Sequence, residues 1–196
     1  MAQPITLDQL AQIPPRKYKI IRNELQTGDL IFCNGNYFFS KIIQKITKSN
    51  WNHVGIIYKD EVLDRVLVLE SENTYGVRLV PLSKYLRDYH GTNKPYKGKI
   101  VAARLHPEIS TNRLQKSISF GLDALTKPNG YIEVIRIAIR LLFKKSRHNN
   151  SRNYISSEFV QTCLKQADIN FKDTDNTISL EEIWNNNQIE FLYRLL

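Results

Sequence analysis

The chain has 196 residues and a formal net charge of +9, and 42% of its residues are hydrophobic. This length favours one domain with a hydrophobic core of its own. No stretch approaches the roughly 20 apolar residues of a bilayer-spanning helix, so a membrane-spanning protein is not expected. The first residues lack the basic and apolar regions of a secretory signal, so we expect a cytoplasmic protein.

The positive charge predicts an anionic partner, whether a membrane surface, a nucleic acid or an acidic substrate. Part of the excess is concentrated in one segment, at Arg136, Arg140, Lys144, Lys145, Arg147 and Arg152. Because no nucleic-acid-binding motif accompanies these residues, we do not expect a nucleic acid as the partner.

The first predicted elements alternate between helix and strand. Thr6 is a suitable N-cap for a helix over 6–13, which Pro14 and Pro15 end. The apolar run 30–33 follows a Gly-Asp turn and reads as a strand. Apolar residues at helical spacing predict a second helix over 38–46.

A β-rich middle and a helical C-terminal part follow. Runs rich in Val, Ile and Leu predict strands over 53–58, 66–71, 77–80 and 100–105. Apolar periodicity predicts helices over 81–89, 111–125, 131–145, 156–167 and 179–185. The expected fold is therefore α+β, a small antiparallel sheet or partial barrel flanked by helices. We expect one domain over 1–196, with an N-terminal extension over 1–24 and a basic loop over 144–153.

Two polar residues stand out in the predicted sheet. His53 opens one strand and Glu70 ends the next, where a carboxylate closing an apolar run needs a partner. A hairpin with Tyr58 opposite Arg65 would set His53 directly opposite Glu70, close enough for a hydrogen bond. The pair could be a general base with its orienting carboxylate, or a purely structural pair.

Ser156 lies at or just inside the N-terminus of the predicted helix over 156–167. Free backbone N–H groups and the positive end of the helix dipole gather there, which suits an oxyanion or a thiolate. A plain helix N-cap is the simpler interpretation of a serine at this place. We reject Cys163 as a substitute nucleophile, because it lies about 10 Å further along the helix.

The sequence gives no sign of a cofactor or metal. The two cysteines, Cys33 and Cys163, each lie in an apolar run and are expected to be buried free thiols. The four histidines have no His or Cys neighbour at the spacing of metal ligands.

Five segments resemble the circularly permuted NlpC-type papain-like proteins, in the same order. They are the runs 28–32, 52–56, 68–71, 76–77 and 154–160, within a resemblance that extends over about 25–169. That group includes YiiX-like bacterial hydrolases, poxvirus proteins and, more distantly, lecithin:retinol acyltransferases. Its nucleophile is a cysteine in the motif that this chain writes Tyr154-Ile155-Ser156-Ser157-Glu158-Phe159-Val160.

The resemblance implies a cysteine-peptidase-like catalytic triad. His53 would be the general base, Glu70 its orienting partner and Ser156 would hold the position of the nucleophile. Neighbouring residues of these motifs would contact substrate, namely Asn52, Tyr154 and Ser157. The substrate would be a peptide or an acylated small molecule whose amide bond is cleaved.

Serine in place of cysteine leaves three interpretations. We favour an inactivating substitution of the cysteine, since the surrounding motif is intact. The chain could instead be a natural serine hydrolase, or a non-catalytic module that keeps its cleft for a peptide or lipid. A thiol becomes a thiolate at a helix N-terminus, whereas a serine hydroxyl stays protonated until it attacks.

The helix preceding the nucleophile motif is strongly apolar. It reads either as a core helix with one charged stripe or as an apolar rim that, with its basic residues, contacts anionic lipid over 131–147.

Overall fold

The computed structural model describes residues 5–37, 40, 41, 44, 49–72, 75–126, 154–171 and 178–196. The predicted helix over 131–145, the basic loop over 144–153 and the proposed membrane contact over 131–147 lie outside these residues. The helix predicted over 38–46 lies mostly outside them, although Ser40, Lys41 and Gln44 are helical.

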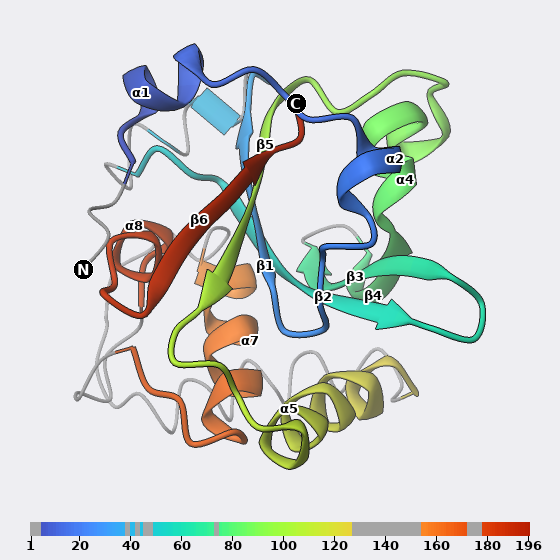
Figure 1. Cartoon of the computed structure of the whole chain (residues 1–196), viewed down its shortest axis with the longest axis vertical. Coiled ribbons are helices and arrows are strands. Elements are labelled where there is room, and N and C mark those ends of the chain that lie inside the picture. Colours follow the sequence, from blue (N-terminus) through green and yellow to red (C-terminus); the bar gives the residue numbers. More distant parts are fainter. Residues whose placement is uncertain are drawn as a thin grey trace.

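Six strands form one antiparallel sheet in the order β4-β3-β2-β1-β5-β6 (Figure 1). The strands are β1 (Leu30–Gly35), β2 (His53–Asp60), β3 (Arg65–Glu72), β4 (Gly76–Pro81), β5 (Gly98–Leu105) and β6 (Ile189–Arg194). The first five confirm the strands predicted from the sequence. The α+β class is confirmed.

Short helices surround the sheet. They are α1 (Leu7–Gln12), α2 (Tyr18–Ile21), α4 (Leu82–Arg87), η1 (Tyr89–Gly91), α5 (Thr111–Asp123), η2 (Ala124–Thr126), α7 (Tyr154–Lys165) and α8 (Leu180–Trp184). Thr6 caps α1 as predicted, because its hydroxyl accepts a hydrogen bond from the backbone of Gln9. Helix α2 and strand β6 were not predicted.

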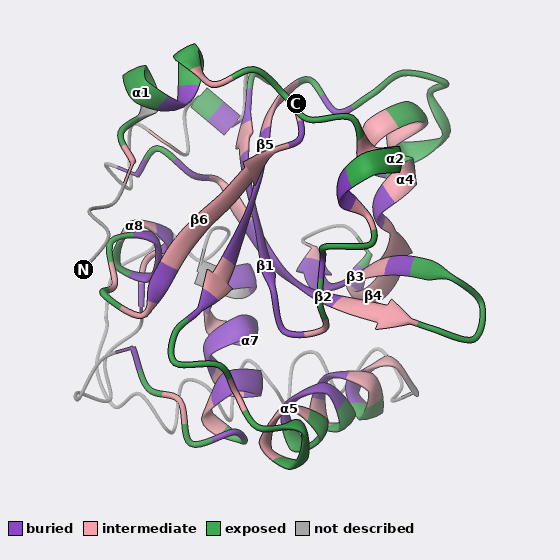
Figure 2. Ribbon diagram, viewed as in Figure 1, coloured by how far each residue is buried: buried purple, intermediate pink, exposed green. Residues whose placement is uncertain are grey.

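Each face of the sheet has its own hydrophobic core. On the α7 face, strand residues such as Phe32, Ile56 and Leu69 pack against α5, α7 and α8. On the α4 face, alternate residues such as Ile57 and Val68 pack against α2 and α4. This division follows from the period of two along a strand, and Figure 2 shows buried residues on the central strands and on α7.

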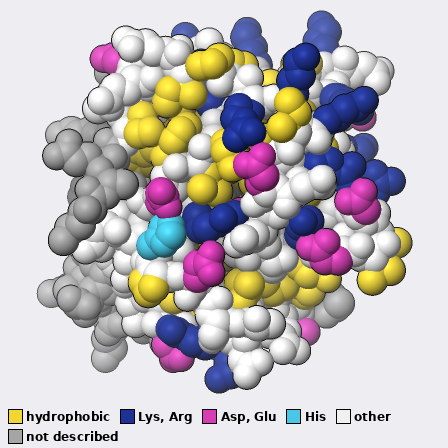
Figure 3. All heavy atoms as spheres, in the orientation of Figure 1, with side chains coloured by type: hydrophobic (Ala, Val, Ile, Leu, Met, Phe, Trp, Pro, Cys, Tyr) yellow, Lys and Arg dark blue, Asp and Glu magenta, His cyan; other side chains and the backbone are white. Residues whose placement is uncertain are grey.

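The outer surface is mixed in charge. Several exposed basic side chains lie at the upper right of the view in Figure 3, with acidic side chains nearby. Lys19 of α2 and Lys84 and Arg87 of α4 are exposed. No described helix is long and apolar enough to cross a membrane.

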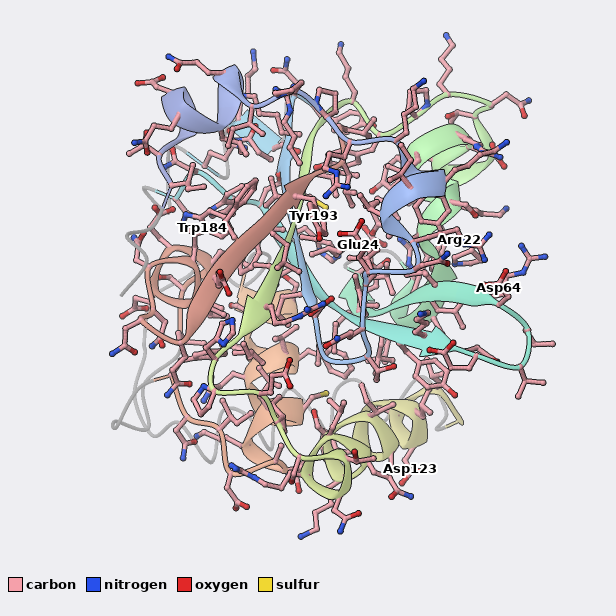
Figure 4. The ribbon with its side chains drawn as sticks, in the orientation of Figure 1. Arg22, Glu24, Asp64, Asp123, Trp184 and Tyr193 are labelled. Atoms are coloured by element: carbon pink, nitrogen blue, oxygen red, sulfur yellow. The ribbon has the colours of Figure 1, made fainter. Side chains whose placement is uncertain are left out.

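The N-terminal segment packs onto the rest of the fold. Leu10 and Ile21 are fully buried. Glu24 and Tyr193 of β6 form a hydrogen bond, and Figure 4 shows these two labelled side chains close together. Arg194 donates hydrogen bonds to the carbonyl groups of Leu10, Ala11 and Ile13. Residues 5–24 are therefore tied to the last strand of the sheet.

Candidate functional site

The structure joins His53 and Glu70 on the α4 face of the sheet. His53 is the first residue of β2, and Glu70 lies near the end of β3. The imidazole Nε2 of His53 lies 2.6 Å from Oε2 of Glu70. The His53 side chain is 14% exposed, whereas that of Glu70 is fully buried.

The register that predicted this contact was wrong by two residues. Tyr58 pairs with Leu67, and Arg65 pairs with Asp60, so the hairpin turn is tighter than assumed. Glu70 continues this register opposite Gly55, two residues from His53 and on the same face. The two side chains meet along a diagonal, within reach of long side chains, and Gly55 contributes no side chain between them.

Two further residues complete the surroundings of Glu70. Arg78 lies directly opposite Glu70 on β4, and its Nε donates a hydrogen bond of 2.7 Å to Oε1. The hydroxyl group of Tyr85, on α4, donates a bond of 2.5 Å to Oε2. Sequence reasoning missed both residues. An arginine within the apolar strand 77–80 was the available signal, whereas Tyr85 was not distinguishable from an ordinary core aromatic.

These contacts keep Glu70 ionised inside the protein. Burial by itself raises the pKa of Glu70, but the charge and hydrogen bond of His53, the charge of Arg78 and the hydrogen bond of Tyr85 lower it to about 2. A carboxylate only accepts hydrogen bonds, so the His53 Nε2 must carry the proton that it shares with Glu70. The other ring nitrogen, Nδ1, is then the basic atom, and it makes no hydrogen bond among the described residues.

Other contacts fix the backbone where β2 begins. The side-chain oxygen of Asn52 accepts hydrogen bonds from the Gly35 amide and the Tyr96 hydroxyl. Glu181 of α8 accepts a bond of 2.9 Å from the backbone of Asn50. Asn52 therefore supports the loop before His53, and its expected contact with substrate stays a prediction.

Ser156 lies in the first turn of α7, as the sequence predicted for the N-terminal part of this helix. It is 5% exposed. The apolar residues behind it, Phe159 and Val160, belong to the core of the α7 face. Among the described residues, no hydrogen bond joins Ser156 to His53, whose contacts with Glu70 lie on the α4 face.

Ser157 and Tyr154 are the two other residues of this motif that were expected to contact substrate. Ser157 is fully buried, and its hydroxyl donates a 2.8 Å bond to the carbonyl group of Ile178. This contact anchors α7 to the segment before α8. Tyr154 is the first residue of α7. Roles for either residue in substrate binding stay predictions.

Both cysteines are buried free thiols, as predicted. Cys33 lies directly opposite His53 on β1, but burial raises the pKa of its thiol well above the ordinary value. Burial likewise raises the pKa of Cys163. Since a thiolate is the reactive form, neither cysteine is a suitable nucleophile in this fold.

The described residues contain no cluster of three or more His, Cys, Asp or Glu side chains that could hold a metal ion.

Comparisons with known proteins agree with this fold. A family model described as "Permuted papain-like amidase enzyme, YaeF/YiiX, C92 family" matches residues 24–191. A crystal structure described as metalloprotein yiiX from Escherichia coli O157:H7 matches with a TM-score of 0.57 and 19% identity. The match covers 86% of this chain and 97% of that chain. No curated protein matches the chain.

The wider resemblance to NlpC-type proteins and lecithin:retinol acyltransferases stays a prediction, because neither match bears on it. The family match begins at residue 24, after the N-terminal segment, and includes His53, Glu70 and Ser156. The chain belongs to the family of permuted papain-like amidases of the YaeF/YiiX type.

Proposed function

We propose that the protein is built to hydrolyse an amide bond through a covalent acyl-enzyme, with a peptide or an acylated small molecule as substrate. His53 is the general base, Glu70 orients it and Ser156 occupies the position of the nucleophile. The observation that carries this proposal is the 2.6 Å contact between His53 Nε2 and a Glu70 side chain that its neighbours keep ionised. That contact leaves Nδ1 as the atom that accepts a proton.

The reaction begins when the Ser156 oxygen attacks the carbonyl carbon and its proton passes to Nδ1 of His53. The carbon–nitrogen bond then breaks, and the leaving amine takes this proton. In the second half, water attacks the acyl carbon and gives a proton to Nδ1 of His53. The bond between the acyl carbon and the Ser156 oxygen then breaks, His53 returns the proton to this oxygen, and the acid product leaves. Backbone N–H groups in the first turn of α7 are suited to stabilise the oxyanion.

The serine is expected to limit this chemistry. A hydroxyl must lose its proton during attack, while a cysteine at a helix N-terminus beside an imidazole is readily ionised. Ser156 also makes no hydrogen bond to His53 among the described residues, although such bonds often tighten only when substrate is bound. We therefore propose that Ser156 replaces a cysteine and that the substitution lowers or abolishes activity.

The experiment is to restore the thiol with Ser156→Cys and to measure alkylation by iodoacetamide with intact-mass spectrometry. The parent chain is an internal control, because Cys33 and Cys163 are fully buried and should not react in the folded protein. We expect one added group on Ser156→Cys and a much slower reaction when His53→Ala is combined with it. Equal rates in the two variants would contradict the proposed base.

A second function is favoured by the serine itself. A non-catalytic module that binds a peptide or lipid would have no need of a reactive group at position 156. In that case His53→Ala leaves the alkylation rate of Ser156→Cys unchanged. Neither the parent chain nor Ser156→Cys then cleaves an amide or an ester.

A further inference from the structure

We propose that Arg78 and Tyr85 are positioning residues that hold Glu70 as a carboxylate and thereby keep the proton of neutral His53 on Nε2. This inference rests on the proposed function, in which Nδ1 of His53 must be free to accept a proton. In the described part of the chain, neither side chain is hydrogen-bonded to Ser156, so each acts through Glu70.

The two oxygens of Glu70 have different partners. Oε1 accepts the 2.7 Å bond from the Arg78 Nε. Oε2 accepts bonds from the Tyr85 hydroxyl and from His53. With three donors around it, the carboxylate has no stable arrangement in which it is itself a donor, and this fixes the direction of the bond to His53.

Arg78 supplies the positive charge that remains beside Glu70 when His53 is neutral. The Glu70 side chain is 0% exposed, and a buried carboxylate without a cation takes up a proton rather than stay charged. A protonated Glu70 could donate to Nε2 of His53. Neutral His53 would then carry its proton on Nδ1, and the base would be lost.

Tyr85 also helps to keep Glu70 an acceptor in its hydrogen bond with His53. Its side chain is almost fully buried, and burial together with the charge of Glu70 raises the pKa of the phenol well above its ordinary value. The phenol therefore stays protonated and remains a donor to Oε2. Because α4 follows β4 directly in the chain, one short segment, residues 76–87, supplies both positioning residues.

The chain offers a matched control for the loss of a buried ion pair. Arg104 donates through Nε to Asp29 at 2.7 Å, the same distance as Arg78 to Glu70. The two arginine side chains are 19% and 20% exposed, and each carboxylate is almost fully buried. No hydrogen bond or ion pair joins Arg104 to His53 among the described residues. Arg104 also donates to the second oxygen of Asp29 and to the carbonyl group of Glu24. Arg104→Gln should therefore cost at least as much stability as Arg78→Gln without changing the imidazole.

The test is the tautomer of His53, read from nitrogen–proton correlations of the ring at about pH 8.5, where an ordinary imidazole is neutral. His53→Gln assigns the signal among the four histidines. We expect the Nε2–H form in the parent chain, in Arg78→Lys and in Arg104→Gln. Arg78→Gln should shift the population to Nδ1–H, and Tyr85→Phe should do so partly.

An unchanged Nε2–H tautomer in Arg78→Gln would overturn the role of Arg78, and the same result in Tyr85→Phe would overturn that of Tyr85. If Arg78→Gln does not fold, Tyr85→Phe alone decides the proposal. In a Ser156→Cys background, Arg78→Gln should slow alkylation about tenfold or more, since the wrong tautomer removes the base. If Arg78→Gln shifts the tautomer but the thiol of Ser156→Cys shows no reactivity that depends on His53, the proposed function is contradicted and the positioning role of Arg78 is supported.

Discussion

The imidazole of His53 and the carboxylate of Glu70 are hydrogen-bonded although the residues lie two positions out of register on neighbouring strands. The glutamate side chain spans this offset, and the absent side chain of Gly55 leaves the space. The contact depends on side-chain length, on the glycine and on charge, and each of these can be varied separately.

If His53 is the general base that we propose, its removal should strongly slow the reaction of a thiol placed at position 156. We expect His53→Ala to slow alkylation of Ser156→Cys by about 100-fold or more, the usual range for a general base. The measurement is the rate of mass increase with iodoacetamide. His106→Ala is the control, because His106 also contacts a glutamate, Glu190, but does so on the surface and away from β2. A similar loss with both variants would point to a general change in the fold.

Two variants of Glu70 should distinguish the effect of its negative charge from the effect of its side-chain length. Glu70→Gln leaves Arg78 partly buried without an anion, and we expect the free energy of unfolding to fall by about 3 kcal/mol or more. Glu70→Asp keeps the charge, but its side chain is too short for the diagonal contact with His53. We therefore expect Glu70→Asp to lose less stability than Glu70→Gln, while both variants slow the thiol reaction of Ser156→Cys equally. Urea unfolding measures the loss of stability.

The matching control is Glu61→Gln, which removes an exposed partner of Lys59. Its effect on unfolding should stay below about 1 kcal/mol. If Glu70→Gln lowers the free energy of unfolding no more than Glu61→Gln does, Glu70 is not held as a buried anion.

The stability of the protein should depend on Glu70 in acid. Its pKa is lowered from an ordinary 4.5 to about 2, so folding favours the ionised form. The stabilisation is complete above about pH 4.5 and is lost as the pH falls towards 2, for a total of about 3 kcal/mol. Urea unfolding at several pH values checks this, and Glu70→Gln should flatten the curve in that window. A curve of unchanged slope would contradict the assignment.

Gly55 should resist even a methyl group. A Cβ atom there would lie 2.6 Å from a methyl group of Val68 and 3.3 Å from Cβ of Glu70. We expect Gly55→Ala to destabilise the fold by about 1–3 kcal/mol, as overpacking usually does. It should also slow the thiol reaction of Ser156→Cys by displacing Glu70. Thermal unfolding and the alkylation rate together test this, and a stable variant with full reactivity would refute the close packing.

The sequence predicted the sheet well where apolar runs were long. The strands beginning near Leu30, His53 and Val66 are buried on both faces and showed as continuous apolar runs. Strand β6 was missed, although Ile189 to Tyr193 is apolar or aromatic apart from Glu190. Its pairing partner, β5, is more than 80 residues earlier in the chain, and no local pattern reveals such pairing.

The site was predictable in part for a similar reason. His53 and Glu70 stood out because polar residues at the ends of apolar strands need partners, and this argument survives an error of two residues in register. An even shift keeps both side chains on the same face. Arg78 and Tyr85 escaped prediction because their role depends on the order of strands and on where α4 folds back over the sheet.

The contacts of Arg194 bear on where a folding unit begins. The family match starts at residue 24, yet Arg194 in β6 is bonded to three carbonyl groups between Leu10 and Ile13. A chain shortened to residues 24–191 would lose Arg194 and its three acceptors together, and it would uncover the apolar surface beneath Leu10 and Ile21. We therefore expect the cooperatively folding unit to extend beyond the family match at both ends, and expression of residues 24–191 alone should yield a weakened domain.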